Sequence, residues 1–157
     1  MNRKVKIVAY QPKYKEVFKK LNEEWISTYF KMEEMDIKSL NNPQSYILDK
    51  GGEILVALYE DIPLGVCALI KMEDNQHDFE LAKMAVSPKA QGKGLGSLLG
   101  KAIIEKAKHL GASTIYLESN TVLDTAIFLY KKLGFKKITE KYTPYSRCNI
   151  QMELRLK

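Results

Sequence analysis

The clearest chemical signal in the sequence is a glycine-rich segment, Gln91-Gly92-Lys93-Gly94-Leu95-Gly96-Ser97. It lies between an apolar run, Leu81 to Val86, and an amphipathic stretch to Leu110, so we predict a turn that joins a strand to a helix. Glycine adopts positive φ angles and brings no Cβ near a ligand. The first amides of a helix lack helical partners and lie at the positive end of its dipole. The segment therefore predicts a phosphate or pyrophosphate site.

The spacing of the glycines separates this segment from two well-known phosphate-binding loops. A P-loop follows the pattern G-x-x-x-x-G-K-[ST], and a dinucleotide-binding fingerprint follows G-x-G-x-x-G with an acidic residue further on. This sequence has Q-x-x-G-x-G instead, with glycines at 92, 94 and 96. A glycine-rich turn that binds no ligand is the alternative interpretation.

Three further segments agree with one particular family. They are the strand pattern before Ser87-Pro88, the strand pattern Thr114 to Glu118 before Asn120, and the terminal pattern Ala126 to Phe135. Together with Gln91, Gly94 and Gly96, these segments make the sequence similar to the GNAT superfamily of N-acetyltransferases, whose motif is R/Q-x-x-G-x-G/A. The resemblance covers residues 53 to 157 and implies acetyl-CoA as co-substrate, with its pyrophosphate at the glycine-rich segment.

The resemblance also implies where the rest of acetyl-CoA binds. Its pantetheine arm would lie between the strand ending at Val86 and the strand ending at Glu118, and would pair with the backbone of Met84, Ala85 and Val86. In the family a bulge splays these strands, a feature that no residue pattern reveals. Asn120 would bond the pantetheine amides, with an ordinary turn residue at a strand end as the alternative. Lys89 or Lys93 would add charge near the phosphates.

Two carboxylates are candidates for the base that deprotonates the acceptor amine. The resemblance places Glu80 where the histone-acetylating branch of the family has its catalytic glutamate, and an exposed strand glutamate is the alternative. Glu118 is the second candidate, because it ends a strand and shares a face with Asn120 by alternation. His77, in a polar connection, and His109, near a helix C-terminus, are weaker candidates.

The proton donor for the leaving thiolate is predicted from the resemblance as well. Tyr130 matches the family's tyrosine that protonates CoA, and a core aromatic is the alternative, since Ile127 and Leu133 share its helical face. Tyr130 therefore counts as both a catalytic and a cofactor-binding residue.

The acceptor site is predicted with the least detail. In the family the early helical region shapes this pocket, which makes Trp25 and Tyr29 candidates, although aromatics at helical spacing are also typical of a core. Tyr145 and Arg147 flank the last connection, in a tail that resembles a subgroup of small bacterial GNAT proteins. Arg147 could grip a substrate carboxylate or pair with Glu140. Peptides, amino acids, polyamines and aminoglycosides all stay open as acceptors.

Composition limits the class of protein. With 157 residues, 18.0 kDa and 45% hydrophobic residues, we expect one N-acetyltransferase domain over residues 1–157. The start has no signal-peptide pattern and no run is long and apolar enough to span a bilayer, so we expect a cytoplasmic protein without a membrane partner. Cys67 and Cys148 predict neither a metal site nor a redox pair. The charge of +6 is spread over helix faces, which argues against nucleic acid as a partner; a homodimer stays open.

The elements that must position these residues follow from hydrophobic periodicity and turn signals. The pattern predicts an α+β fold with a mixed, mostly antiparallel sheet and helices on both faces, in which the strand after the glycine-rich helix returns parallel. The predicted strands are Val5 to Ala9, Glu53 to Tyr59, Leu64 to Met72, Phe79 to Val86, Thr114 to Glu118, Lys136 to Tyr142 and Asn149 to Leu156. The predicted helices are Tyr14 to Tyr29, Met32 to Leu40, Leu95 to Leu110 and Leu123 to Leu133.

The sequence thus favours an acetyl-CoA-dependent N-acetyltransferase that acts on a primary amine of a small molecule, amino acid or peptide. Two alternatives are a non-catalytic acyl-CoA-binding module on the same fold and a basic protein associated with nucleic acid. The presence of Tyr130 and Glu80 favours the enzyme over the first alternative.

Overall fold

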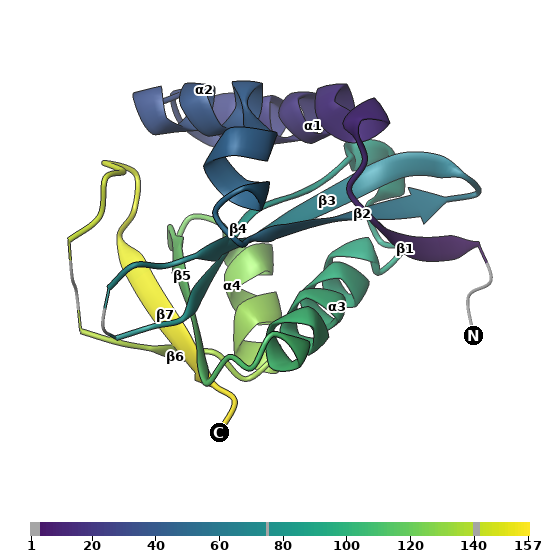
Figure 1. Ribbon diagram of the computed structural model, residues 1–157. Coiled ribbons are helices and arrows are strands. Elements are labelled where there is room, and N and C mark those ends of the chain that lie inside the picture. The colour runs from purple at the N-terminus through teal and green to yellow at the C-terminus, as the bar shows by residue number, and fades with distance from the viewer. Residues whose placement is uncertain (1–3, 75, 140–141) are drawn as a thin grey trace.

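In the computed structural model, which describes residues 4–74, 76–139 and 142–157, seven strands form one sheet in the order β1-β2-β3-β4-β5-β7-β6. Neighbouring strands are antiparallel except for β4 and β5, which are parallel. Helices cover both faces of the sheet (Figure 1). The predicted mixed, mostly antiparallel sheet with helices on both faces is confirmed.

Most elements lie close to where the sequence places them. The helices are α1 (Lys15–Tyr29) and α2 (Glu34–Asn41) on one face, and α3 (Leu95–His109) and α4 (Asp124–Lys132) on the other. The strands are β1 (Val5–Ala9), β2 (Glu53–Tyr59), β3 (Ile62–Lys71), β4 (Phe79–Val86), β5 (Thr114–Ser119), β6 (Lys136–Lys137) and β7 (Ile150–Arg155). Short helical turns occur at Pro12–Tyr14, Gln44–Leu48 and Pro88–Ala90.

The first hairpin turn is tighter than predicted. We expected a loop from Glu60 to Pro63, but only Glu60 and Asp61 form the turn, with φ angles of 50° and 68°. Left-handed backbone at both positions is typical of the two-residue turns whose twist matches a hairpin. Pro63 lies inside β3, where the register shifts between Ala57 and Leu58, and such a bulge tolerates a residue without an amide hydrogen.

The strand predicted from Lys136 to Tyr142 is also shorter than expected. Only Lys136–Lys137 pairs regularly with β7, although the Ile138 amide still donates to the Gln151 carbonyl at 3.0 Å. Residues 140 and 141 lie outside the described residues, and Tyr142 is 84% exposed. The chain has therefore left the sheet by Tyr142, which explains why the alternation there does not continue as a strand.

A bulge in β4 divides the centre of the sheet. Val66 of β3 pairs with Ala85 and Ala68 pairs with Ala82, so Lys83 and Met84 together lie opposite Cys67. Lys83 has a φ of 53°, in the left-handed region that non-glycine residues seldom adopt.

The bulge coincides with a separation of β4 from β5. The two strands pair at Phe79 with Ile115 and at Glu80 with Tyr116, and among the described residues the rest of β4 has no strand partner on that side. The split is the feature that the resemblance led us to expect and that no residue pattern could show.

Two hydrophobic clusters lie on opposite faces of the sheet. One joins α3 and α4 to the sheet and contains Leu99, Ile103, Leu81 and Ile115, among others. The other joins α1, α2 and the turn Gln44–Leu48 to the sheet, and Phe18, Leu40 and Val56 lie at its centre, each fully buried. The first cluster includes residues of both β4 and β5, so it joins the two strands on the side of α3 and α4.

Candidate active site

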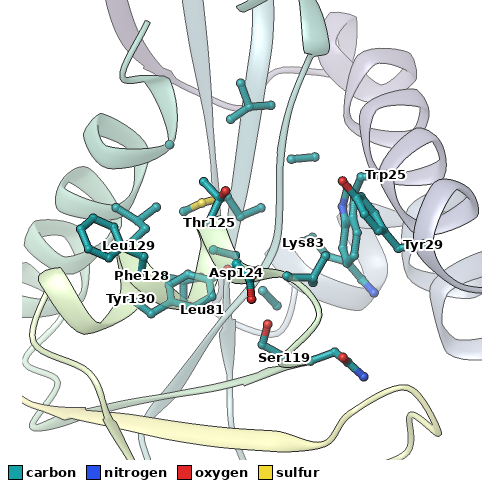
Figure 2. Close-up of a pocket in the computed structure, with 18 of the residues that line it drawn as sticks. Trp25, Tyr29, Leu81, Lys83, Ser119, Asp124, Thr125, Phe128, Leu129 and Tyr130 are labelled. Atoms are coloured by element: carbon teal, nitrogen blue, oxygen red, sulfur yellow. The ribbon is translucent and has the colours of Figure 1, made fainter. Parts of the chain in front are cut away.

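A cavity of about 690 Å³ passes through the split between β4 and β5. Figure 2 shows Trp25 and Tyr29 of α1 on one side of it, Phe128, Leu129 and Tyr130 of α4 on the other, and Lys83 between them. Of the predicted site residues, Lys89, Lys93 and the weaker candidates His77 and His109 do not line this cavity. The others do: Trp25, Tyr29, Glu80, Met84, Ala85, Val86, Gln91, Gly92, Gly94, Leu95, Gly96, Ser97, Glu118, Asn120, Tyr130, Tyr145 and Arg147.

The glycine-rich segment opens the cavity at the N-terminus of α3. Gly92 and Gly94 have φ angles of 79° and 77°, and a Cβ at either position would meet nothing within 4 Å. The first helical hydrogen bond runs from the Leu98 amide to the Gly94 carbonyl, 3.1 Å away. The three preceding amides therefore have no acceptor in the described chain and lie at the positive end of the helix dipole. An anion fits this arrangement.

The Lys93 side chain points away from the cavity. Its ammonium lies 4.9 Å from the centre of the Tyr59 ring, a cation–π contact. The lysine remains close to the segment through its backbone, but the contact of its side chain is with β2.

The exposed edge of β4 is the second feature of the cavity. From Leu81 to Val86 the side of β4 that faces β5 pairs with no strand in the part of the chain that the structure describes. An extended ligand with amide groups can pair with such an edge in the way that an additional strand does. Met84, Ala85 and Val86 all line the cavity here, as the resemblance implies.

The Tyr130 hydroxyl is available to a ligand. Its ring packs in the core at 6.1 Å from the Phe135 ring centre, so the predicted core role is real. Its hydroxyl donates to none of the described residues. It is not among fully buried polar atoms without a partner, of which the described residues have none, and Tyr130 lines the cavity. Burial raises the pKa of Tyr130, which keeps the hydroxyl protonated at neutral pH.

The two candidate carboxylates differ in how they are held. Glu118 accepts from the Tyr116 hydroxyl at 2.7 Å and from the Thr143 hydroxyl at 2.5 Å, so both oxygens are oriented by neutral donors. The Gln151 amide donates in turn to the Tyr116 oxygen at 2.6 Å. Glu80 is half-buried and lies opposite Tyr116 in the register, at the point where the strands begin to separate. Both carboxylates face the same cavity.

Asn120 performs the turn role that we named as its alternative. Its side-chain oxygen accepts from the Val122 amide at 2.9 Å, and its side-chain nitrogen donates to the Arg147 carbonyl at 2.8 Å. These contacts hold the end of β5 against the loop before β7. The role of Asn120 toward a cofactor remains a prediction.

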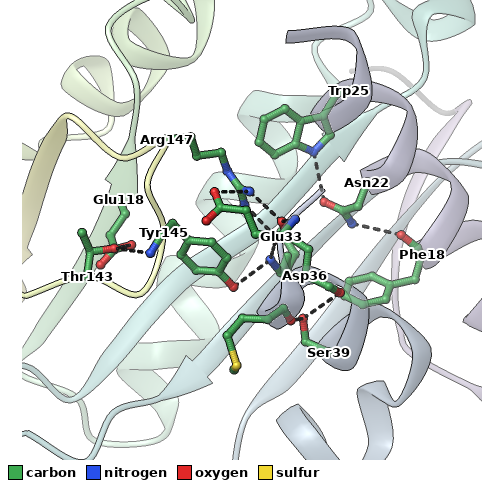
Figure 3. A network of polar contacts seen from close by, with 12 residues as sticks. Phe18, Asn22, Trp25, Glu33, Asp36, Ser39, Glu118, Thr143, Tyr145 and Arg147 are labelled. Atoms are coloured by element: carbon green, nitrogen blue, oxygen red, sulfur yellow. Dashed lines mark hydrogen bonds and ion pairs between the residues drawn. The ribbon is translucent and has the colours of Figure 1, made fainter. Parts of the chain in front are cut away.

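A cluster of buried charges was not predicted. The fully buried Asp36 accepts from Arg147 at 2.6 and 2.7 Å and from the Lys83 ammonium at 2.7 Å (Figure 3). The Tyr145 hydroxyl lies 3.2 Å from the Lys83 nitrogen, and Glu33 lies 3.4 Å from Arg147. Arg147 is thus an interior residue with 13% of its side chain exposed, and the predicted alternative partner, Glu140, lies outside the described residues.

Only part of this cluster has a signal in the sequence. Glu33 and Asp36 form a capping box in which the Glu33 amide donates to Asp36 at 2.9 Å, and this box starts α2 two residues later than we predicted. The spacing E-x-x-D differs from the usual capping-box pattern, in which Ser or Thr precedes Glu or Gln, so even this part of the cluster has only a weak signal. The Lys83 side chain gives none, because only the bulge turns it toward α2.

The charges in the cluster hold Asp36 ionised. Burial alone would raise its pKa, but Arg147 and Lys83 outweigh burial and lower it to about 2. Burial lowers the pKa of Lys83, while the Asp36 carboxylate opposes that effect. For Arg147 the hydrogen bonds to Asp36 outweigh burial and raise the pKa. Asp36 is therefore charged at neutral pH and binds both cations of the cluster.

The other candidates have structural contacts. The His77 ring lies 2.8 Å from Glu153, and the His109 ring lies 2.8 Å from the Glu105 carbonyl. Burial raises the pKa of the Cys67 thiol, which leaves it unreactive. Among the described residues, we find no group of His, Cys, Asp and Glu that could hold a metal, and no helix there has the length and apolar character needed to cross a bilayer.

Comparison with known families and proteins agrees with this geometry. A model described as the acetyltransferase (GNAT) family matches residues 15–135. The chain is 33% identical over 100 residues to YjgM of Escherichia coli K12, an uncharacterised N-acetyltransferase, and 33% identical over 100 residues to the N-acetylaspartate synthetase of Danio rerio. Each alignment covers 62% of this chain, but only 60% and 35% of those relatives, so the chain spans part of their length.

Solved structures share the fold over the whole chain. An acetyltransferase of the GNAT family from Staphylococcus aureus MU50 superposes with a TM-score of 0.86 at 22% identity, over 98% of this chain and 99% of that one. The acetyltransferase yncA from Salmonella typhimurium, solved with its cofactor acetyl-CoA, superposes with a TM-score of 0.79 at 16% identity, over 99% and 95%.

Proposed function

The chain belongs to the acetyltransferase (GNAT) family, and on this premise we propose that it transfers the acetyl group of acetyl-CoA to a primary amine of a small molecule, amino acid or peptide. The observation that supports this most is that one cavity joins three features. These are the free amides at the start of α3, the free edge of β4 and the Tyr130 hydroxyl. An anion site, a strand edge and a proton donor are what transfer from a CoA thioester to an amine requires.

The residues present fit acetyl-CoA. The amides of Leu95, Gly96 and Ser97 would bind its pyrophosphate, and the open space at Gly92 and Gly94 leaves room for phosphate oxygens close to the backbone. The edge of β4 from Met84 to Val86 would pair with the amides of its pantetheine arm.

The chemistry assigned to the side chains is proton transfer. Acetyl-CoA supplies an activated acetyl carbonyl; the acceptor nitrogen forms the new C–N bond as the C–S bond breaks. Tyr130 would give its proton to the departing sulfur, and its raised pKa means that it holds a proton to give. Glu80 or Glu118 would accept the proton that the amine loses. Each proton thus has a donor and an acceptor within the cavity.

A thiol-release assay tests the proposal. The protein is mixed with acetyl-CoA and a panel of primary amines that covers amino acids, peptides, polyamines, aminoglycosides and aromatic amines, and free CoA is measured. In parallel, acetyl-CoA should raise the melting temperature by mass action. Absence of any melting shift would contradict the CoA site. A clear shift with no acetylated product from any amine would favour the non-catalytic acyl-CoA-binding module instead.

A further inference from the structure

On the acceptor side of the cavity, two cations are already paired with a carboxylate of the chain. Lys83 and Arg147 line the cavity at the end nearest α1, and both could in principle meet an acceptor carboxylate. Asp36 already occupies that role, since it contacts the Lys83 ammonium at 2.7 Å and both terminal nitrogens of Arg147 at 2.6 and 2.7 Å. The two cations are therefore matched by a carboxylate of the chain itself.

The remaining carboxylates make the binding of an anion at this end of the cavity electrostatically unfavourable. Glu33 lies 3.4 Å from Arg147, which balances the second positive charge. Glu118 lines the cavity as well, and its two oxygens accept only from the neutral hydroxyls of Tyr116 and Thr143. An incoming carboxylate would thus meet the lining carboxylates Glu80 and Glu118, beside two cations that Asp36 and Glu33 already balance, in a largely buried site where like charges repel more strongly than in water.

The walls around the cluster are aromatic. Trp25 donates its indole N–H to Asn22 at 3.1 Å, so its polar atom is used inside α1 and its ring presents apolar surface (Figure 3). Phe30 packs edge-on against Trp25 at 6.4 Å, and both line the cavity with Tyr29. The Tyr29 side chain is 57% exposed, as expected for a ring that a ligand would cover. These walls suit an apolar or aromatic body beside the amino group.

We propose that Asp36 determines acceptor specificity: by neutralising Arg147 and Lys83, it sets the pocket for primary amines that have an apolar or aromatic body and no carboxylate next to the amino group. This inference rests on the proposed acetyl transfer. Asp36 does not touch the reacting atoms and acts through the two cations that it holds.

Matched acceptors test the inference on the unmodified protein. Phenethylamine, phenylalaninamide and phenylalanine share one aromatic body. The last two differ in the group next to the amino group, which is a neutral carboxamide in phenylalaninamide and a charged carboxylate in phenylalanine. They are compared at equal concentrations of free amine, both by kcat/KM and by calorimetric binding to the protein saturated with CoA. We expect kcat/KM and affinity to be about 10-fold or more higher for phenylalaninamide than for phenylalanine, the size of one unfavourable charge contact.

The variant Asp36→Asn then tests the residue. It keeps the shape of the side chain and removes its charge, so Arg147 and Lys83 become free to meet a carboxylate. We expect the preference for phenylalaninamide to shrink about 10-fold or more, through a gain on phenylalanine. Glu34→Gln, an amide substitution on the exposed side of the same helix, should leave the preference unchanged.

The outcomes separate the two proposals. A wild-type preference near one, or in favour of phenylalanine, overturns the inference, and so does a folded Asp36→Asn protein with the wild-type preference. If Asp36→Asn does not fold, the wild-type comparison alone decides. Acetylation of phenylalanine in preference to the amide would leave acetyl transfer intact, whereas failure to acetylate any amine in the panel would remove the function on which the inference rests.

Discussion

Asp36 on α2 and Arg147 in the loop before β7 form a two-pronged ion pair across 111 positions of sequence, with nitrogen–oxygen distances of 2.6 and 2.7 Å. Since Asp36 also contacts Lys83 at the bulge of β4, one carboxylate joins three segments around the acceptor side of the cavity. Removing one partner of a buried ion pair leaves the remaining charges buried without compensation, which lowers the free energy of unfolding.

The first prediction concerns acid stability. Asp36 has a pKa of about 2 in the folded protein against 3.8 for an ordinary aspartate, so its contribution to folding is complete above about pH 4 and disappears as the pH falls toward 2. The contribution amounts to about 2 kcal/mol. Urea unfolding of wild type and Asp36→Asn should show a difference of about 3 kcal/mol near neutral pH that narrows below pH 4. A difference that stays constant from pH 7 to pH 3 would contradict the ionised state of Asp36.

The second prediction uses two glycines at opposite ends of α3. Gly94 and Gly111 have φ angles of 77° and 83°, and a Cβ at either would meet nothing within 4 Å. Glutamate at either position should therefore cost similar backbone strain, about 1 kcal/mol. Only Gly94→Glu places a negative charge in the proposed phosphate site, so it should abolish the melting shift by acetyl-CoA, while Gly111→Glu should retain it. Equal CoA affinity in both folded variants would exclude the glycine-rich segment as the phosphate site.

The third prediction concerns Tyr130. Tyr130→Phe keeps the ring that packs against Phe135 and removes the only group proposed to protonate the sulfur. We expect kcat to fall about 10²-fold or more with CoA affinity unchanged. Tyr46→Phe, on the turn Gln44–Leu48 and outside the cavity, is the matched control. Full kcat in Tyr130→Phe, under conditions where chemistry limits turnover, would show that the proton comes from elsewhere.

The fourth prediction separates the two carboxylates by pH. We expect Glu80→Gln to lower the rate near neutral pH, with partial recovery at higher pH as more free amine forms in solution. Glu118→Gln should instead disturb the contacts to Tyr116 and Thr143 and lower the rate similarly at all pH values. Rate–pH profiles of both variants decide the matter. Should Glu118→Gln alone show the recovery, the base is Glu118.

The sequence predicted the elements well where the signal is local. The bounds of β1, β2 and β4 agree with the prediction, because alternation and apolar runs report directly on which side of a strand is buried. The glycine-rich segment was also predictable, since its glycines have a backbone role. That Tyr130 and the glycine-rich segment belong to one site was predicted from the family resemblance, because periodicity carries no information about contacts between distant parts of the chain.

The acceptor side could not be predicted, because its residues are defined by partners far away in the chain. Arg147 invites pairing with a substrate carboxylate when its neighbours alone are considered, but its partner Asp36 lies on α2. Asp36 itself has no signal in the sequence beyond its place in the helix predicted from Met32 to Leu40. Its burial depends on Lys83, whose side chain would point into the opposite core if β4 were regular.

The bulge at Lys83 adds one residue to β4 and thereby shifts the alternation of side chains between the two faces of the sheet. Before it, Phe79 and Leu81 pack with the α3 cluster; after it, Met84 and Val86 do so, and Ala85 packs with the α1 cluster. The side chains on the α3 face thus have odd numbers before the bulge and even numbers after it, and the Lys83 side chain lies on the other face, where it contacts Asp36. A substitution at Lys83 would change one side chain and keep the bulge. Deletion of Lys83 would instead remove the extra residue: Met84 alone would lie opposite Cys67, and Met84, Ala85 and Val86 would keep their faces. The strand would then be regular at the place where it now separates from β5.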